Sequence, residues 1–169
     1  MWLSPLDVFC HWATYYPTRV AVQVNGANVT YSELASRALA VAARIGEQTT
    51  SKTNRPRCAV VSNLKLDFLV AAYGAMFARC SLIVVNPKLS EPELAQLLTE
   101  NDAKHLVCDA SALALAQGAA KLATGLRPPI ALSTAASTTV IEHDYLLRWK
   151  LDSSHGQLDD EWGLVFSSG

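Results

Sequence analysis

Residues 58–85 read CAVVSNLKLDFLVAAYGAMFARCSLIVV, and this stretch decides the fold class. It begins with a short apolar run, Cys58 to Val61, continues with apolar residues at helical spacing from Leu66 to Phe77, and closes with a second apolar run, Leu82 to Val85. Strands that are apolar on both faces are typical of a parallel sheet covered by helices on each side. The stretch therefore predicts a strand, a helix and a second parallel strand, in an α/β fold.

The same alternation continues towards the C-terminus. The next predicted elements are a helix from Glu91 to Asn101, a strand from His105 to Cys108 and a helix from Ala110 to Ala123. Apolar runs near Ile130 and Val140 follow, and then a polar surface excursion from Asp152 to Glu161 and a last strand from Trp162 to Phe166. We expect residues 58–169 to form a three-layer arrangement, with a mostly parallel sheet flanked by helices.

Residues 1–46 are predicted to add a helix, a hairpin and a second helix. Ser4-Pro5 is a typical helix start, and the first helix is expected to end near Tyr16-Pro17. Two β-rich runs then flank Asn25-Gly26, a dipeptide suited to the positive φ angles of a tight hairpin turn. Apolar residues at helical spacing follow Tyr31, and Gly46 is expected to stop that helix near Ile45, before an exposed loop.

Composition excludes several classes of function. Fourteen basic against fifteen acidic residues give a formal charge of −1, and no stripe of Lys and Arg offers a nucleic acid surface. The N-terminus lacks the basic start of a secretory signal, and the longest weakly charged window, 68–87, contains Arg79, so we expect no membrane insertion. The four cysteines have no paired short spacing, which predicts buried thiols and a cytoplasmic protein instead of a zinc site or disulfides.

Two tempting catalytic interpretations find little support in the sequence. None of the four histidines has a serine, cysteine or acidic partner at a spacing typical of a catalytic triad. The turn after the first buried strand, Ser62-Asn63-Leu64, lacks the glycines that let a dinucleotide pyrophosphate approach. Structural roles are therefore predicted for the histidines, and a dinucleotide site is not expected.

The last strand leads directly into Ser167, Ser168 and Gly169, which are small, flexible and able to form hydrogen bonds. Such residues let backbone N–H groups approach phosphate oxygens, because glycine has no Cβ and serine adds a hydroxyl. Taken alone, this ending is more typical of a serine-rich terminus than of a phosphate-binding loop. The motif gains meaning from the segments that precede it.

Those segments resemble the adenylate-forming superfamily of acyl-CoA synthetases, luciferases and peptide-synthetase adenylation domains. Residues 166–169 resemble the first four positions of that family's phosphate loop, and residues 13–22, 29–34 and 75–87 resemble three earlier family segments in the same order. Arg79 stands where the family usually has glycine, which puts the backbone angles of that turn in question. Residues 9–12 and 86–89 are similar to the bacterial o-succinylbenzoate-CoA ligases of menaquinone synthesis.

The resemblance implies a two-step reaction. A carboxylic acid substrate attacks the α-phosphorus of ATP with release of pyrophosphate, Mg²⁺ assists, and the thiol of CoA then captures the acyl-adenylate. Ser167, Ser168 and Gly169 would be the first cofactor-binding contacts, and no catalytic or metal-binding residue is expected in residues 1–169. The resemblance places the remaining chemistry in later residues, so the chain is expected to be an inactive partial N-terminal domain.

Two alternatives stay open. The chain can be the first part of an acid–CoA ligase, or it can be a truncated family member that acts as a binding module without catalysis. A homo-oligomer is compatible with either alternative. The sequence that follows Gly169 in the reading frame discriminates between them.

Overall fold

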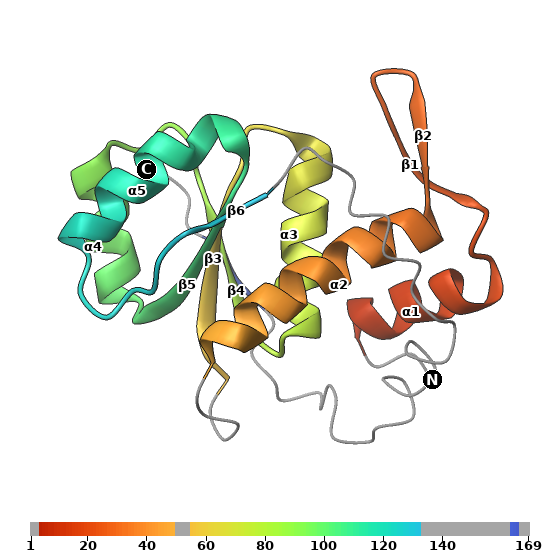
Figure 1. Cartoon of the computed structure of the whole chain (residues 1–169), viewed down its shortest axis with the longest axis horizontal. Helices are drawn as coiled ribbons and strands as arrows, with labels where there is room; N and C mark the ends of the chain where they lie inside the picture. The colour runs from red at the N-terminus through yellow and green to blue at the C-terminus, as the bar shows by residue number, and fades with distance from the viewer. Residues whose placement is uncertain (1–3, 50–54, 133–162, 166–169) are drawn as a thin grey trace.

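The computed structural model describes residues 4–49, 55–132 and 163–165 (Figure 1). The helices and strands follow in the order α1 (Pro5–Tyr15), β1 (Val20–Val24), β2 (Ala27–Thr30), α2 (Tyr31–Gln48), β3 (Arg57–Val61), α3 (Lys65–Phe77), β4 (Ser81–Val85), α4 (Glu91–Glu100), β5 (Ala103–Cys108), η1 (Ala110–Ala112), α5 (Leu113–Leu122), β6 (Ile130–Ala131) and β7 (Gly163–Val165). The expected runs near Val140 and from 152 to 161 lie outside the described residues.

A five-stranded sheet in the order β6-β5-β3-β4-β7 forms the middle layer. Every pairing within it is parallel: Cys58 lies opposite Leu82 and His105, and Val165 lies opposite Val84. Helices α4 and α5 lie on one side of the sheet, while α1, α2 and α3 lie on the other (Figure 1). The prediction of a three-layer α/β fold with a parallel sheet is therefore confirmed.

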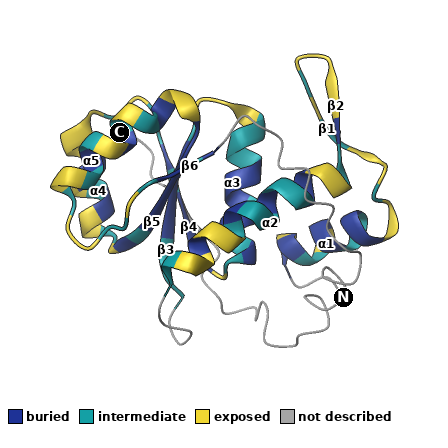
Figure 2. Ribbon diagram, in the orientation of Figure 1, coloured by how far each residue is buried: buried dark blue, intermediate teal, exposed yellow. Residues whose placement is uncertain are grey.

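The two sides of the sheet are covered by separate apolar clusters, because successive strand residues point to opposite faces. Cys58 and Val60 belong to the cluster shared with α1, α2 and α3, whereas Ala59 and Val61 belong to the cluster shared with α4 and α5. Figure 2 shows buried strands between helices whose outward faces are exposed. The strands are therefore apolar on both faces because each face packs against its own layer of helices.

The N-terminal part has the predicted helix, hairpin and helix. The Ser4 side chain accepts a hydrogen bond from the Asp7 N–H at 3.1 Å and caps α1. The hairpin turns at Asn25 and Gly26, whose φ angles are 51° and 79°, as the Asn-Gly pair predicts. Thr30 and Glu33 then form a capping box that starts α2.

Helix α2 corrects one expectation, because it continues past Gly46 and ends at Gln48. Gly46 does not adopt the positive φ of a helix-terminating glycine. Side chains at the end of α2 are instead held by β6 and the segment before it: Gln48 Nε2 donates to the Pro128 carbonyl at 3.2 Å, and Arg44 Nη1 donates to the Ala131 carbonyl at 2.6 Å. These contacts favour an extra turn that no local pattern indicated.

The turn between α3 and β4 answers the question raised by Arg79. Arg79 has a φ of 60°, the left-handed conformation for which glycine is the usual residue. Its N–H still donates to the Met76 carbonyl at 2.9 Å, so the turn closes as it would with glycine. The turn therefore forms with Arg79 at a conformational cost.

Aromatic side chains join α1 to its neighbours. Phe9 stacks on Tyr73 of α3 with ring centroids 4.1 Å apart, and Trp12 stacks on Tyr31 at 5.9 Å. Trp12 is half-buried, as packing rather than ligand stacking predicts. Within the described part of the chain, no helix is both long and apolar enough to cross a bilayer.

Candidate functional site at the carboxyl edge of the sheet

The strands of the sheet are parallel, so their carboxyl ends meet along one edge. Strand β3 ends at Val61, β4 at Val85, β5 at Cys108 and β7 at Val165. Ligands of open α/β sheets bind outside this edge, where the loops after the strands supply polar groups.

The predicted phosphate-binding residues Ser167, Ser168 and Gly169 lie outside the described residues, and their role stays a prediction. The described residue nearest to them in sequence is Val165, the last residue of β7, which pairs in parallel with Val84 of β4. The chain therefore leaves β7 at the carboxyl edge of the sheet. This is the strand placement that a phosphate-binding function of residues 166–169 requires.

A second position at this edge lies between β3 and β5. Strand β3 is followed by α3, which packs on the face shared with α1 and α2, whereas β5 is followed by α5 on the opposite face. The direction of winding therefore reverses between these two neighbouring strands. Such a reversal is the topological switch point, where a crevice between diverging loops commonly holds a ligand.

The switch point is filled by the side chain of Asp109, which follows β5 and is 0% exposed. Its Oδ2 accepts hydrogen bonds from the Ser62 hydroxyl at 2.7 Å, from the Asn63 N–H at 2.6 Å and from the Leu64 N–H at 3.3 Å. Its Oδ1 accepts from the Ser111 hydroxyl at 2.6 Å and from the Ala112 N–H at 2.9 Å. One carboxylate thus joins the loop after β3 to the loop after β5.

These bonds decide the ionisation of Asp109. Burial disfavours its charged form, but the hydrogen bonds from Ser111, Ser62 and the N–H groups of Ala112 and Asn63 outweigh burial and lower the pKa of Asp109 to about 2. Asp67, in the first turn of α3, shows the opposite shift, because burial and then the Asp109 charge raise the pKa of its carboxyl. At neutral pH the Asp109 carboxylate is therefore a buried, compensated anion.

Sequence reasoning missed Asp109, although a signal existed. An acidic residue directly after a buried strand, followed by a serine two positions later, is typical of a carboxyl-edge loop. The donors of Asn63 and Leu64 lie 46 and 45 residues away along the chain, so only the strand order shows that they share one site.

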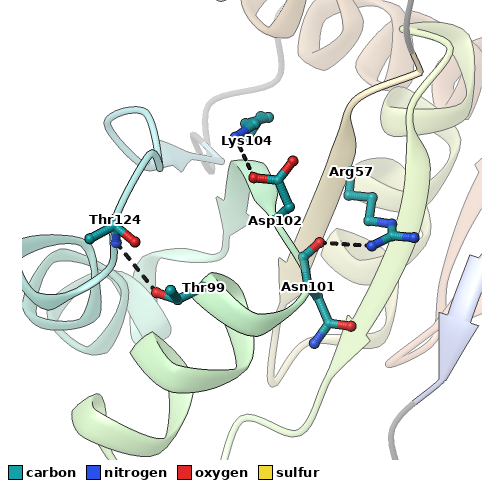
Figure 3. A network of polar contacts seen from close by, with 6 residues as sticks. All are labelled: Arg57, Thr99, Asn101, Asp102, Lys104 and Thr124. Atoms are coloured by element: carbon teal, nitrogen blue, oxygen red, sulfur yellow. Dashed lines mark hydrogen bonds and ion pairs between the residues drawn. The ribbon is translucent and has the colours of Figure 1, made fainter.

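The amino edge of the sheet holds a different polar network (Figure 3). Arg57 Nη1 donates to the Asn101 carbonyl at 3.1 Å, and Lys104 pairs with Asp102. The Thr124 N–H donates to the Thr99 hydroxyl at 3.3 Å. These contacts tie the starts of β3 and β5 to the end of α4 and to the segment after α5, which is a structural function.

The remaining titratable candidates are structural in the described region. His105 is 1% exposed, with Nε2 3.3 Å from the Thr49 hydroxyl and Nδ1 3.2 Å from Gln48 Oε1. Burial, and then the Arg127 charge, lower the pKa of His105 to about 4, so it is neutral at pH 7. Of the other candidates, His11 lies in α1 with its ring centroid 4.8 Å from that of Tyr15. His143, His155 and the acidic residues 159–161 lie outside the described residues.

The cysteines are buried free thiols, as predicted. Burial raises the pKa of Cys80 to about 12 and that of Cys108 to about 11, which keeps both thiols protonated and unreactive. Among residues 4–49, 55–132 and 163–165, no three side chains of the His, Cys, Asp and Glu types gather to hold a metal ion.

Several solved ligases and synthetases share this fold. A fatty acyl CoA synthetase of Mycobacterium tuberculosis superposes with a TM-score of 0.68 at 17% identity, covering 96% of this chain and 32% of its own. Coronafacic acid ligase from Pectobacterium brasiliense gives 0.71 at 14% identity, covering 95% and 33%. A double mutant of o-succinylbenzoate CoA synthetase from Bacillus subtilis gives 0.60 at 17% identity, covering 84% and 26%. The chain thus spans between a quarter and a third of their lengths.

The family profile described as AMP-binding enzyme matches residues 9–169, which is nearly the whole sequence. No curated protein matches the chain. The matched range includes all the described strands and the predicted phosphate loop. The chain therefore belongs to the AMP-binding enzyme family, and its described part has the fold of the adenylate-forming ligases.

Proposed function

We propose that this chain is the N-terminal part of an ATP-dependent acid–CoA ligase. In the proposed reaction a carboxylate oxygen attacks the α-phosphorus of ATP, the bond to pyrophosphate breaks, and the CoA thiol then displaces AMP to give a thioester. The observation that carries the proposal is the exit of β7 at the carboxyl edge, beside β4, directly before residues 166–169. Membership of the AMP-binding family supports the same conclusion.

In this proposal Ser167, Ser168 and Gly169 hold the β- and γ-phosphates of ATP through hydroxyl and backbone N–H groups. Glycine suits the last of these positions, because a Cβ would obstruct the approach of phosphate to the backbone. ATP supplies the adenylyl group, Mg²⁺ neutralises phosphate charge and CoA supplies the acceptor thiol. This chain's own residues contribute positioning and hydrogen bonds.

We further propose that the 169 residues alone form no acyl-adenylate, because they contain only the first four positions of the phosphate-loop motif. The assignment to o-succinylbenzoate is the finer part of the proposal and rests on residues 9–12 and 86–89. The buried free thiols favour a reducing, cytoplasmic location. A binding module without catalysis is the competing function, and it is favoured if the reading frame ends after Gly169.

The test uses the protein encoded by the complete reading frame. We expect acid-dependent pyrophosphate release and AMP formation, and we expect Gly169→Ala to lower kcat/KM for ATP about tenfold or more, because the added Cβ obstructs the approach of phosphate to the backbone N–H groups. Gly46→Ala is the matched control, because its added methyl group meets nothing within 4 Å.

Equal losses in Gly169→Ala and Gly46→Ala would refute the role of the loop. Pyrophosphate release by the 169-residue chain, at the turnover of the complete protein, would refute its predicted inactivity. If other acids in a panel support AMP formation and o-succinylbenzoate does not, the subfamily assignment is refuted and the ligase reaction still holds.

A further inference from the structure

The switch point between β3 and β5 has the construction of an anion receptor. Its donors come from two loops that are distant in sequence: the Ser62 hydroxyl and the N–H groups of Asn63 and Leu64 precede α3, and the Ser111 hydroxyl and the Ala112 N–H belong to η1. Leu64, the residue before α3, has no side chain that caps the helix. The Leu64 N–H also donates to Ser62 Oγ at 3.1 Å, whereas the acceptor that both loops share comes from the residue after β5.

The acceptor that meets them is a carboxylate with a full set of hydrogen bonds. Five donors address the two oxygens of Asp109, and a carboxylate has about four lone-pair sites. The side chain is 0% exposed, so neither water nor a cation has access to it. Metal binding at Asp109 is therefore disfavoured, and the site accommodates one small planar anion.

We propose that Asp109 is a built-in ligand: its carboxylate occupies the anion position of the β3–β5 crevice, excludes phosphate from it, and leaves a formate-binding site when it is removed. A nucleotide phosphate consequently has no place at this switch point. The inference concerns β3, β5 and α3 alone, and it does not depend on the ligase activity proposed above. Failure of either proposal leaves the other intact.

The experiment deletes the anion and restores it from solution. Asp109→Ala removes a group of the size and charge of formate, so we expect a lower Tm in sodium chloride and a saturable recovery in sodium formate at equal ionic strength. At a tenfold excess over Kd the recovery should be about 3–5 °C. Asp109→Asn fills the site without an anion, and Asp102→Ala removes a carboxylate that is 75% exposed. Neither control should respond to formate.

Amide NMR supplies a readout at the site itself. In the unsubstituted protein, the N–H signals of Asn63 and Leu64 should stay unchanged when inorganic phosphate or formate is added. In Asp109→Ala both signals should move with formate along the same saturation curve as the Tm. In Asp109→Asn both should move upfield, because an amide oxygen is a weaker acceptor than a carboxylate.

Three results would overturn the inference. The first is a phosphate-dependent shift of the Asn63 and Leu64 signals in the unsubstituted protein, which would show an open site. The second is an equal formate response in Asp109→Ala and Asp102→Ala, which would show a general salt effect. The third is that the Asn63 and Leu64 N–H signals are unchanged in Asp109→Asn. This variant keeps the side-chain volume, so its signals test the inference even if Asp109→Ala does not fold.

Discussion

Gly74 allows α2 and α3 to approach each other closely, and its replacement should separate them. A Cβ built at Gly74 would lie 2.7 Å from Cβ and Cγ1 of Val41 and 2.9 Å from the carbonyl oxygen of Ala38. Ordinary contacts between such atoms are about 3.5–4.0 Å, so α3 must shift by about 1 Å. Backbone oxygen cannot rotate away as a side chain can, and α3 also packs on the sheet. The strain therefore has no inexpensive local release.

The magnitude follows from two opposing effects of Gly74→Ala. Overpacking of a core contact costs about 1–3 kcal/mol, whereas alanine in place of a helical glycine gains about 1 kcal/mol. We expect a net loss of up to about 2 kcal/mol in the free energy of unfolding. Gly46→Ala, in an open part of α2, should instead gain about 0.5–1 kcal/mol, since nothing lies within 4 Å of its added methyl group.

Urea unfolding followed by circular dichroism measures both variants, with equal m values as the check that only stability has changed. The double variant Val41→Ala with Gly74→Ala should lose less than the sum of the two single losses, because removal of Cγ1 relieves part of the overlap. A Gly74→Ala protein as stable as Gly46→Ala would refute the argument that the close approach of the helices requires glycine.

Three further predictions concern other parts of the described fold. Arg79→Gly should raise the free energy of unfolding by about 1 kcal/mol in urea titrations, because φ is 60° at this position; a loss would show that Arg79 side-chain contacts outweigh the strain. The pKa of His105 is lowered from 6.5 to about 4 in the folded protein, so the unfolded state binds more protons than the folded state between pH 4 and pH 6.5. Stability should fall by up to about 3 kcal/mol as pH drops from 6.5 to 4, and His105→Gln should abolish that slope. Thr30→Ala removes the capping box with Glu33 and should lower the Tm by about 2–4 °C, a shift that differential scanning calorimetry resolves.

Local signals in the sequence predicted most of the elements. Two-faced apolar runs indicated β3, β4 and β5, and Asn25-Gly26 indicated the hairpin turn, because each pattern depends on residues that are close in sequence. The end of α2 was predicted wrongly, since Gly46 was interpreted as a helix stop. The contacts that extend the helix to Gln48 join it to the segment around Pro128, 80 residues away, and no local pattern contains them.

Strand order was also beyond the reach of the sequence, and with it the site at Asp109. The alternation of strands and helices is compatible with more than one order, whereas the observed order β6-β5-β3-β4-β7 places β3 beside β5 although β4 lies between them in the chain. Only this order brings Asp109 to Asn63. The phosphate loop could be proposed from sequence because its motif is contiguous, but a buried anion with donors from two loops has no contiguous signature.

The two positions at the carboxyl edge differ in what fills them, and this difference has a functional consequence. At the β3–β5 switch point, the N–H groups of Asn63 and Leu64 already have a carboxylate, so a phosphate there would have to displace a buried side chain and leave its charge uncompensated. After β7, which pairs with β4, the sequence instead continues from Val165 through Phe166 to the small hydroxyl-bearing residues Ser167 and Ser168. Phosphate recognition by this fold is therefore expected after β7, because the site that topology alone would favour is closed by the protein's own anion.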